Sequence, residues 1–207
     1  NAGSGGLKIS AALTASTTAT VGGTLTTSAA FAPSAGTITM NNGSVIATSG
    51  SVPTFRNLTI ADGASVSGSS GNFTIASGST FTVGSGGVFT PYFLGTITST
   101  GATITGAGKI FVNLGTGTAK TLDGQYGTAT KTLTNLTVEY GSAGINGISN
   151  HSYSNLILTQ LAGMTQGSTF TVNGTLTVNS TFNAQSSSTV TMNNGSSLVV
   201  GGSATFY

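Results

Sequence analysis

Apolar and polar residues alternate along most of this chain with a period of two. The pattern is clear at 37–40, 73–75, 81–83 and 189–192, where the polar position is usually threonine. Such alternation predicts short β-strands with one face in a core and the other in water. Most segments end at Gly, Asn-Gly or Ser-Gly, which suit the positive φ angles of tight turns. No window has the spacing of an amphipathic helix, so we expect an all-β chain.

Repeated segments favour a solenoid among the all-β folds. The hexapeptide Gly-Ser-Thr-Phe-Thr-Val occurs at 78–83 and again at 167–172. A second motif begins with an aromatic residue or Leu, then any residue, then Asn-Leu and two β-branched or aliphatic residues. It occurs at 55–60, 133–138 and 153–158. In a solenoid, each turn of the chain buries its apolar residues against the next turn.

The strongest repeat joins the two ends of the chain. Residues 20–44 align with 171–196 once one inserted residue is allowed, and 14 of the 25 aligned pairs are identical. Stacked coils of roughly 20–25 residues would give roughly eight to ten rungs in a rod about 40–50 Å long. We expect a single domain, 1–207, with 1–19 as an N-terminal strand or cap. A β-sandwich is the alternative, because regularly spaced turn signals also suit that fold.

The Asn-Leu motif resembles a known group of repeats, and so does the segment Gly-Thr-Leu-Thr-Val-Asn-Ser-Thr-Phe-Asn-Ala at 174–184. Both are similar to the β-helices of large bacterial surface proteins, the filamentous-haemagglutinin-like and autotransporter-passenger-like adhesins. The resemblance covers most of residues 20–207. It implies a right-handed parallel β-helix at the cell surface. The aspartates of calcium-binding nonapeptide repeats are missing, so it implies no calcium site.

Composition narrows the expected location and partners. Only 4% of the residues are charged, against roughly 25% in soluble globular domains. A surface solvated by hydroxyls and amides is typical of secreted proteins, so we expect an extracellular or cell-surface location. The basic residues are scattered singly, which predicts no nucleic-acid partner. No apolar run reaches the roughly 18 residues of a membrane helix. The chain has no cysteine, which excludes disulfides and thiolate metal ligands.

Groups able to carry catalysis are few. The carboxylates are Asp62, Asp123 and Glu139, and the two aspartates precede glycines, as turn residues do. His151 is the only histidine. It cannot build a metal site alone, and no nucleophile-elbow sequence accompanies it. We therefore predict no enzyme activity, cofactor or metal.

Threonine recurs in Thr-x-Thr units, for example at 24–26, 37–39, 80–82 and 103–105. Stacked in register, these units would form an outward ladder of the kind that ice-binding solenoids use. Threonine is also the ordinary residue of the wet face of a strand, and the units are irregularly spaced along the chain. Ice binding is therefore a secondary expectation.

The aromatic and asparagine residues are assigned mainly to the interior. Four phenylalanines lie on the inward phase of their strands: Phe73, Phe81, Phe170 and Phe182. Core stacking is the expected role of such rings. Tyr92, Tyr126 and Tyr140 lie in the least regular third of the chain and are expected at the surface. The asparagines of the Asn-Leu motif are expected to stack in internal ladders.

The end of the sequence suggests an interface. Residues 197–207 still have the pattern of strands and include no helix or charged cap. An uncapped rung exposes backbone groups and apolar side chains. Either the chain is cut from a longer array, or this end docks on the next copy. The residues expected to make the contact are Leu198, Val200, Phe206 and Tyr207.

Together these patterns predict a structural subunit of an extracellular filament, sheath or cell-surface fibre. Its partner would be another copy of itself, because a head-to-tail contact that does not close builds a polymer. The alternative is an adhesin segment of a longer protein that binds glycans or another surface.

Overall fold

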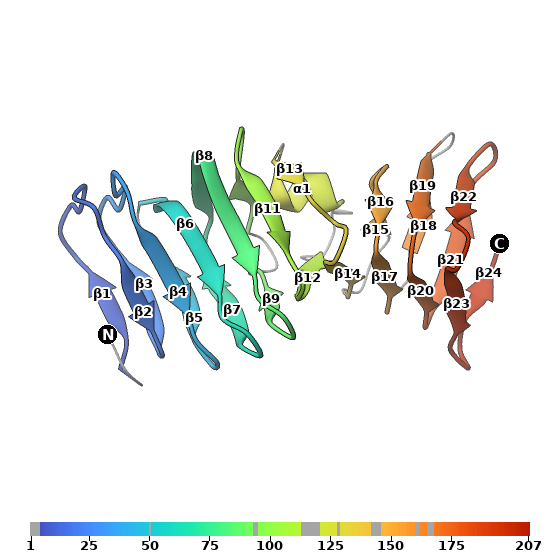
Figure 1. Cartoon of the computed structure of the whole chain (residues 1–207), viewed down its shortest axis with the longest axis horizontal. Helices are drawn as coiled ribbons and strands as arrows, with labels where there is room; N and C mark the ends of the chain where they lie inside the picture. Colours follow the sequence, from blue (N-terminus) through green and yellow to red (C-terminus); the bar gives the residue numbers. More distant parts are fainter. Residues whose placement is uncertain are drawn as a thin grey trace.

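The computed structural model describes residues 5–49, 51–92, 95–112, 121–127, 129–141, 146–159, 162–164 and 168–207. These residues form an elongated stack of short strands, with the two chain ends at opposite ends of the stack (Figure 1). Each turn of the chain adds one rung, and there are about eight turns. The helix α1 (Leu122–Tyr126) lies near the middle of the stack.

Every strand pairing among the described residues is parallel. Each residue lies beside one from the next turn, as Ile38 lies beside Leu58 and Leu156 beside Leu176. The predicted β-solenoid is therefore confirmed. The β-sandwich alternative is wrong, because sandwiches of that kind are built from antiparallel sheets.

The largest sheet, which we call sheet 1, follows the rod from one end to the other. Its strands, in spatial order, are β1 (Leu7–Ile9), β3 (Thr24–Thr27), β5 (Val45–Thr48), β7 (Ser65–Ser70), β9 (Val88–Thr90), β12 (Lys109–Val112), β14 (Thr137–Tyr140), β17 (Asn155–Leu158), β20 (Thr175–Val178) and β23 (Ser197–Val200). The edges of this sheet are β1 and β23. The two edges therefore lie at opposite ends of the molecule.

Three further sheets complete the other sides of the rungs. Sheet 2 contains β2 (Ala19–Val21), β4 (Thr37–Met40), β6 (Thr54–Ile60), β8 (Phe73–Val83), β11 (Thr103–Gly106) and β13 (Thr130–Lys131), with β10 (Ile97–Thr98) beside β8. Sheet 3 contains β15 (Asn146–Gly147), β18 (Ala162–Met164), β21 (Thr181–Ala184) and β24 (Thr205–Phe206). Sheet 4 contains β16 (Ser152–Tyr153), β19 (Thr169–Val172) and β22 (Thr189–Met192).

Inward side chains of successive rungs stack into continuous columns. The four phenylalanines expected in the core are all buried, none more than 5% exposed. Rings in neighbouring rungs meet edge to face, with centroids 5.4 Å apart for Phe31 and Phe55 and 6.1 Å apart for Phe182 and Phe206. Edge-to-face contact is a favoured geometry for aromatic pairs. The alternation in the sequence thus places the aromatic rings correctly.

Two of the three tyrosines predicted at the surface lie in the core instead. Tyr126 and Tyr140 are fully buried, whereas Tyr92 is partly exposed. Tyr126 belongs to α1, which packs inward, and its hydroxyl donates to the carbonyl oxygen of Phe111 at 2.6 Å. Burial raises the pKa of Tyr126 well above its ordinary value of 10.0, so the phenol stays protonated. The expectation failed because the polar end of each ring finds a buried partner.

Side chains of Asn and Asp link consecutive rungs. Six of them accept a hydrogen bond from a backbone N–H one turn later: Asn42, Asn57, Asp62, Asn72, Asn150 and Asn155. The donor lies 19 to 24 residues further along the chain. Asn57 and Asn155 belong to the Asn-Leu motif, and they bond to backbone rather than forming the predicted internal ladder. Their role is to satisfy N–H groups at the corners of the rungs.

Candidate functional site

One cluster of charged side chains lies beside α1. Lys131 is in register with the inward-facing Ile104, so its stem occupies a core column. Its side chain is 1% exposed, and its Nζ lies 2.8 Å from an Asp123 carboxylate oxygen. Nζ also donates to the carbonyl oxygens of Gly127 at 2.7 Å and Ala129 at 3.2 Å. The buried ammonium group therefore has three acceptors.

The start of α1 holds Asp123 in place. Thr121 caps the helix by accepting a hydrogen bond from the Gly124 N–H at 2.9 Å, which satisfies one free donor of the first turn. The Asp123 N–H donates to the Ser149 hydroxyl at 3.2 Å. The Asp123 carboxylate lies 2.9 and 3.1 Å from Nε2 of His151. Asp123 thus joins a core lysine to the histidine on a later rung.

This geometry does not assemble a hydrolytic triad. The structure brings His151 and Asp123 together, but no described serine hydroxyl bonds to the second ring nitrogen of His151. No group of three or more His, Asp or Glu side chains suited to a metal ion occurs among the described residues. Glu139 lies elsewhere, bonded to Lys109 at 2.8 Å and to the Thr159 hydroxyl at 2.6 Å. The Asp123 cluster connects α1 to Lys131 and to His151 through the contacts given above.

Asp123→Asn is expected to destabilise the fold in a pH-dependent way. Burial would raise the pKa of Asp123, but hydrogen bonds and positive charge from Lys131 and His151 more than offset burial and lower it below 3.8. The carboxylate therefore stabilises the fold above the ordinary pKa, and this contribution disappears as the pH falls through the lowered value. The side chain is 50% exposed, so we expect a loss of about 1 kcal/mol at neutral pH.

Urea unfolding from pH 7 to pH 2.5 measures this effect. The difference in unfolding free energy between the wild type and Asp123→Asn should be largest near neutral pH. It should disappear as the pH falls below the ordinary carboxyl pKa. Asp62→Asn is the matched control, because Asp62 accepts from the Ser85 N–H at 2.8 Å and an Asn oxygen can replace that acceptor. A gap that stays constant with pH would show that the ion pair does not stabilise the fold.

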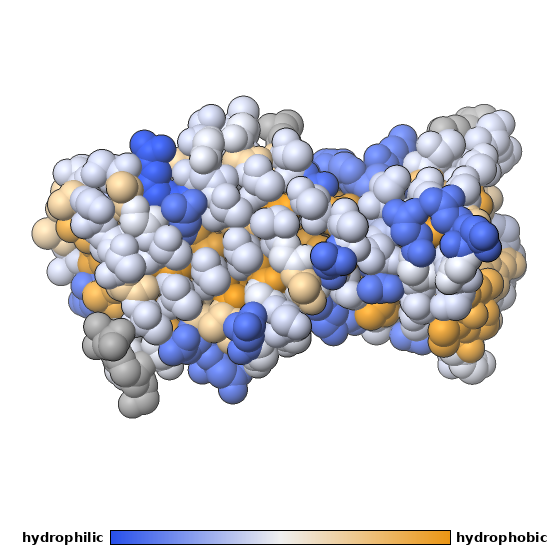
Figure 2. Space-filling view, viewed as in Figure 1, coloured by the Kyte–Doolittle hydropathy of each residue, from blue (hydrophilic) through white to orange (hydrophobic). Residues whose placement is uncertain are grey.

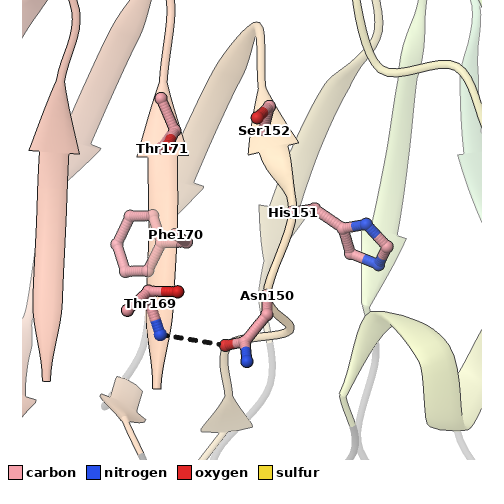
Figure 3. Close-up of a pocket in the computed structure, with 6 residues that line it drawn as sticks. All are labelled: Asn150, His151, Ser152, Thr169, Phe170 and Thr171. Atoms are coloured by element: carbon pink, nitrogen blue, oxygen red, sulfur yellow. Dashed lines mark hydrogen bonds between the residues drawn. The ribbon is translucent and has the colours of Figure 1, made fainter. Parts of the chain in front are cut away.

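A shallow hollow lies next to His151 between two rungs. It has a volume of about 190 Å³ and is lined by Asn150, His151, Ser152, Thr169, Phe170 and Thr171. Figure 3 shows that the His151 ring is turned toward α1, while Asn150 accepts from the Thr169 N–H at 3.1 Å. The His151 ring and the Asn150 side chain are thus already bonded within the protein.

The end of the rod formed by β22, β23 and β24 is apolar and open. All four residues expected at the assembly interface are there, with exposed fractions of 51% for Leu198, 52% for Val200, 47% for Phe206 and 75% for Tyr207. Figure 2 shows hydrophobic surface gathered at this end of the molecule. No rung lies beyond this one among the described residues.

The exposed side chains continue columns that are buried in the preceding rungs. Leu198 is in register with Leu176, and Val200 with Val178. The Phe206 ring stacks edge to face on Phe182 with a centroid distance of 6.1 Å. Leu176 and Phe182 are no more than 4% exposed. The open rung therefore presents the solenoid core in cross-section.

The opposite end of the rod has the same construction. Leu7 is in register with Leu25 in the first described strand pair, and Leu13 forms a parallel bridge with Phe31. Both leucines are only partly buried, and among the described residues each has a rung on one side only. Leu7, Ile9 and Leu13 line a hollow at this end. Each end of the described rod thus offers a partly open layer of the core.

A scan against protein-family models, a search of curated proteins and a search of solved structures each found no match. The resemblance to bacterial surface β-helices therefore stays a prediction. No helix among the described residues is long and apolar enough to cross a membrane.

Proposed function

We propose that this protein is a structural subunit of an extracellular filament, sheath or surface fibre that grows by head-to-tail stacking. One observation carries the proposal: the two ends of the rod are the two edges of the same parallel sheet. A β1 strand from a second copy has the direction needed to continue the ladder after β23. Unpaired edge strands are natural templates for such pairing.

The side chains at the two ends are complementary in a defined register. In the register that pairs both apolar positions of β1, Leu7 of one copy lies over Leu198 of the other, and Ile9 over Val200. Leu13 then faces Phe206 on the adjacent side of the rung. The contact between copies therefore consists of the side where β1 meets β23 and the side where Leu13 meets Phe206. One strand position stays unfilled between β22 and the next copy's β2, because the described chain enters its first rung at β1.

The internal repeat supports this docking. Leu25 aligns with Leu176, and Phe31 with Phe182, when residues 20–44 are matched to 171–196. All four are buried in equivalent positions of their rungs, on β3, β20 and the adjacent sides. Rungs near the two ends therefore share a cross-section. One copy can therefore extend another along the two sides of the rung that carry β23 and Phe206.

Charge does not oppose the contact. Residues 189–207 contain no charged side chain, and the strand that would meet them, β1, contains only Lys8. Like charges brought together at an interface would cost several kcal/mol. The low charge of the whole chain also permits lateral packing of rods, as expected in an extracellular fibre.

Polymerisation of residues 1–207 tests the proposal. We expect sedimentation velocity to show species that grow with concentration. Electron microscopy should show fibres with an axial repeat of about 48 Å, because one copy adds the ten strands of sheet 1 to the ladder. A monodisperse monomer at every concentration would overturn head-to-tail stacking. It would favour the adhesin-segment alternative, in which the next part of a longer chain covers the open rung.

A further inference from the structure

The outer face of sheet 2 carries two straight columns of threonine. One column consists of Thr20, Thr39, Thr59, Thr82 and Thr105, each paired with the next across neighbouring strands. The second consists of Thr37, Asn57, Thr80, Thr103 and Thr130. The only interruption in these ten paired positions is Asn57. In the view of Figure 2, the surface over β6, β8 and β11 is mostly near the middle of the hydropathy scale.

Sheet 1 shows that this regularity is not a general property of the fold. Its outward positions belong to the same kind of parallel strand, yet they include charged, aromatic and aliphatic residues: Lys8, Val45, Ala47, Lys109, Phe111, Glu139, Ile157 and Val199. A preference of threonine for the wet face of strands would act on both sheets. Only the two strands β19 and β22 of sheet 4 share the pattern, with Thr169 beside Thr189 and Thr171 beside Thr191, so the difference between sheets 1 and 2 needs a cause specific to the face of sheet 2.

The columns form a two-dimensional lattice of hydroxyl and methyl groups. Neighbouring rungs are about 4.8 Å apart, and the two threonines of one Thr-x-Thr unit are about 6.6 Å apart along the strand. The oxygens of crystalline ice repeat on this same scale. Hydroxyls fixed at such intervals hold water in matching positions, while the methyl groups limit other arrangements of that water.

We propose that the threonine columns of sheet 2 bind ice. No charged side chain occupies either column, and such a charge would organise its own hydration shell and disturb the lattice. Arg56 lies next to Asn57, at the register shift between β6 and β8, outside the two columns. The columns also contain no aromatic ring, the usual platform for stacking on sugars. This absence favours ice over a crystalline polysaccharide as the bound solid.

Partition into growing ice tests the inference. The wild-type chain should be enriched in an ice shell grown slowly from dilute solution and should slow ice recrystallisation. Thr59→Tyr places a large ring in the middle of one column and should reduce partition to the level of a protein that does not bind ice. Thr82→Tyr serves the same purpose if Thr59→Tyr does not fold, as judged by circular dichroism.

Thr26→Tyr is the matched control, because Thr26 faces outward on sheet 1 between Lys8 and Ala47. It should partition into ice as the wild type does. Exclusion of the wild type from ice would overturn the inference, and so would equal losses in Thr26→Tyr and Thr59→Tyr. Binding to chitin or cellulose particles that Thr59→Tyr abolishes, without binding to ice, would overturn it in favour of a polysaccharide. A variant that cannot polymerise should still bind ice, since the columns lie away from the open rung.

Discussion

Gly106→Ala is expected to lower the free energy of unfolding by about 3–5 kcal/mol, a large effect for one methyl group. Gly106 ends β11 with a φ of 138°, a conformation that L residues rarely adopt. An alanine Cβ there would lie 2.0 Å from the Val83 carbonyl oxygen. That oxygen accepts from the N–H groups of Ala107 at 3.0 Å and Gly108 at 3.2 Å. The neighbouring rung cannot retreat without losing these bonds.

Gly43→Ala separates backbone strain from the steric effect. Gly43 also has a positive φ, 74°, but a Cβ there would meet nothing within 4 Å. Its loss should be about 1–2 kcal/mol, the cost of a left-handed conformation for an L residue. Urea unfolding followed by far-UV circular dichroism measures both variants. Equal losses would show that the close approach of the rungs at Gly106 does not limit the fold.

Much of the fold can be read from local pattern. Alternation places Phe81 and Phe170 inward because a strand has a strict period of two, whatever its neighbours are. The repeats predict stacking because a rung of this size cannot bury its own apolar face. The alternation needs only neighbouring residues, and the repeats need only a comparison of segments along the chain. Neither inference requires a contact in space, and the structure confirms both.

Contacts that depend on loop length could not be read in this way. Asp123 and His151 are 28 residues apart, and they meet only because α1 fills one side of a rung. Tyr126 was expected at the surface because the helix interrupts the strand pattern around it. Tyr140 follows the inward phase of β14, two residues after Val138, so the alternation alone places it in the core. Thr-x-Thr units look irregular along the chain because the turns between rungs differ in length. In space those differences are absorbed at the corners, and Thr39, Thr59 and Thr82 align.

Val200→Glu is expected to abolish head-to-tail assembly. Val200 faces inward in register with Val178, and the proposed contact buries it against Ile9 of the next copy. A carboxylate buried there would have no partner and would cost several kcal/mol. Since about 2.7 kcal/mol corresponds to roughly a hundredfold in affinity, assembly should disappear over the concentration range in which the wild type polymerises.

Val199→Glu makes the same change one residue earlier and should preserve assembly. Val199 is 49% exposed, close to the 52% of Val200, but it is in register with the outward-facing Thr177. A glutamate there would lie beside Lys8 of the next copy, so its stacking should be at least as strong as that of the wild type and should weaken with added salt. Sedimentation velocity at two salt concentrations measures both variants, with circular dichroism to confirm that each is folded. If Val199→Glu blocked assembly as completely as Val200→Glu does, the proposed register would be contradicted. If Val200→Glu still assembled, the open rung would not be the interface.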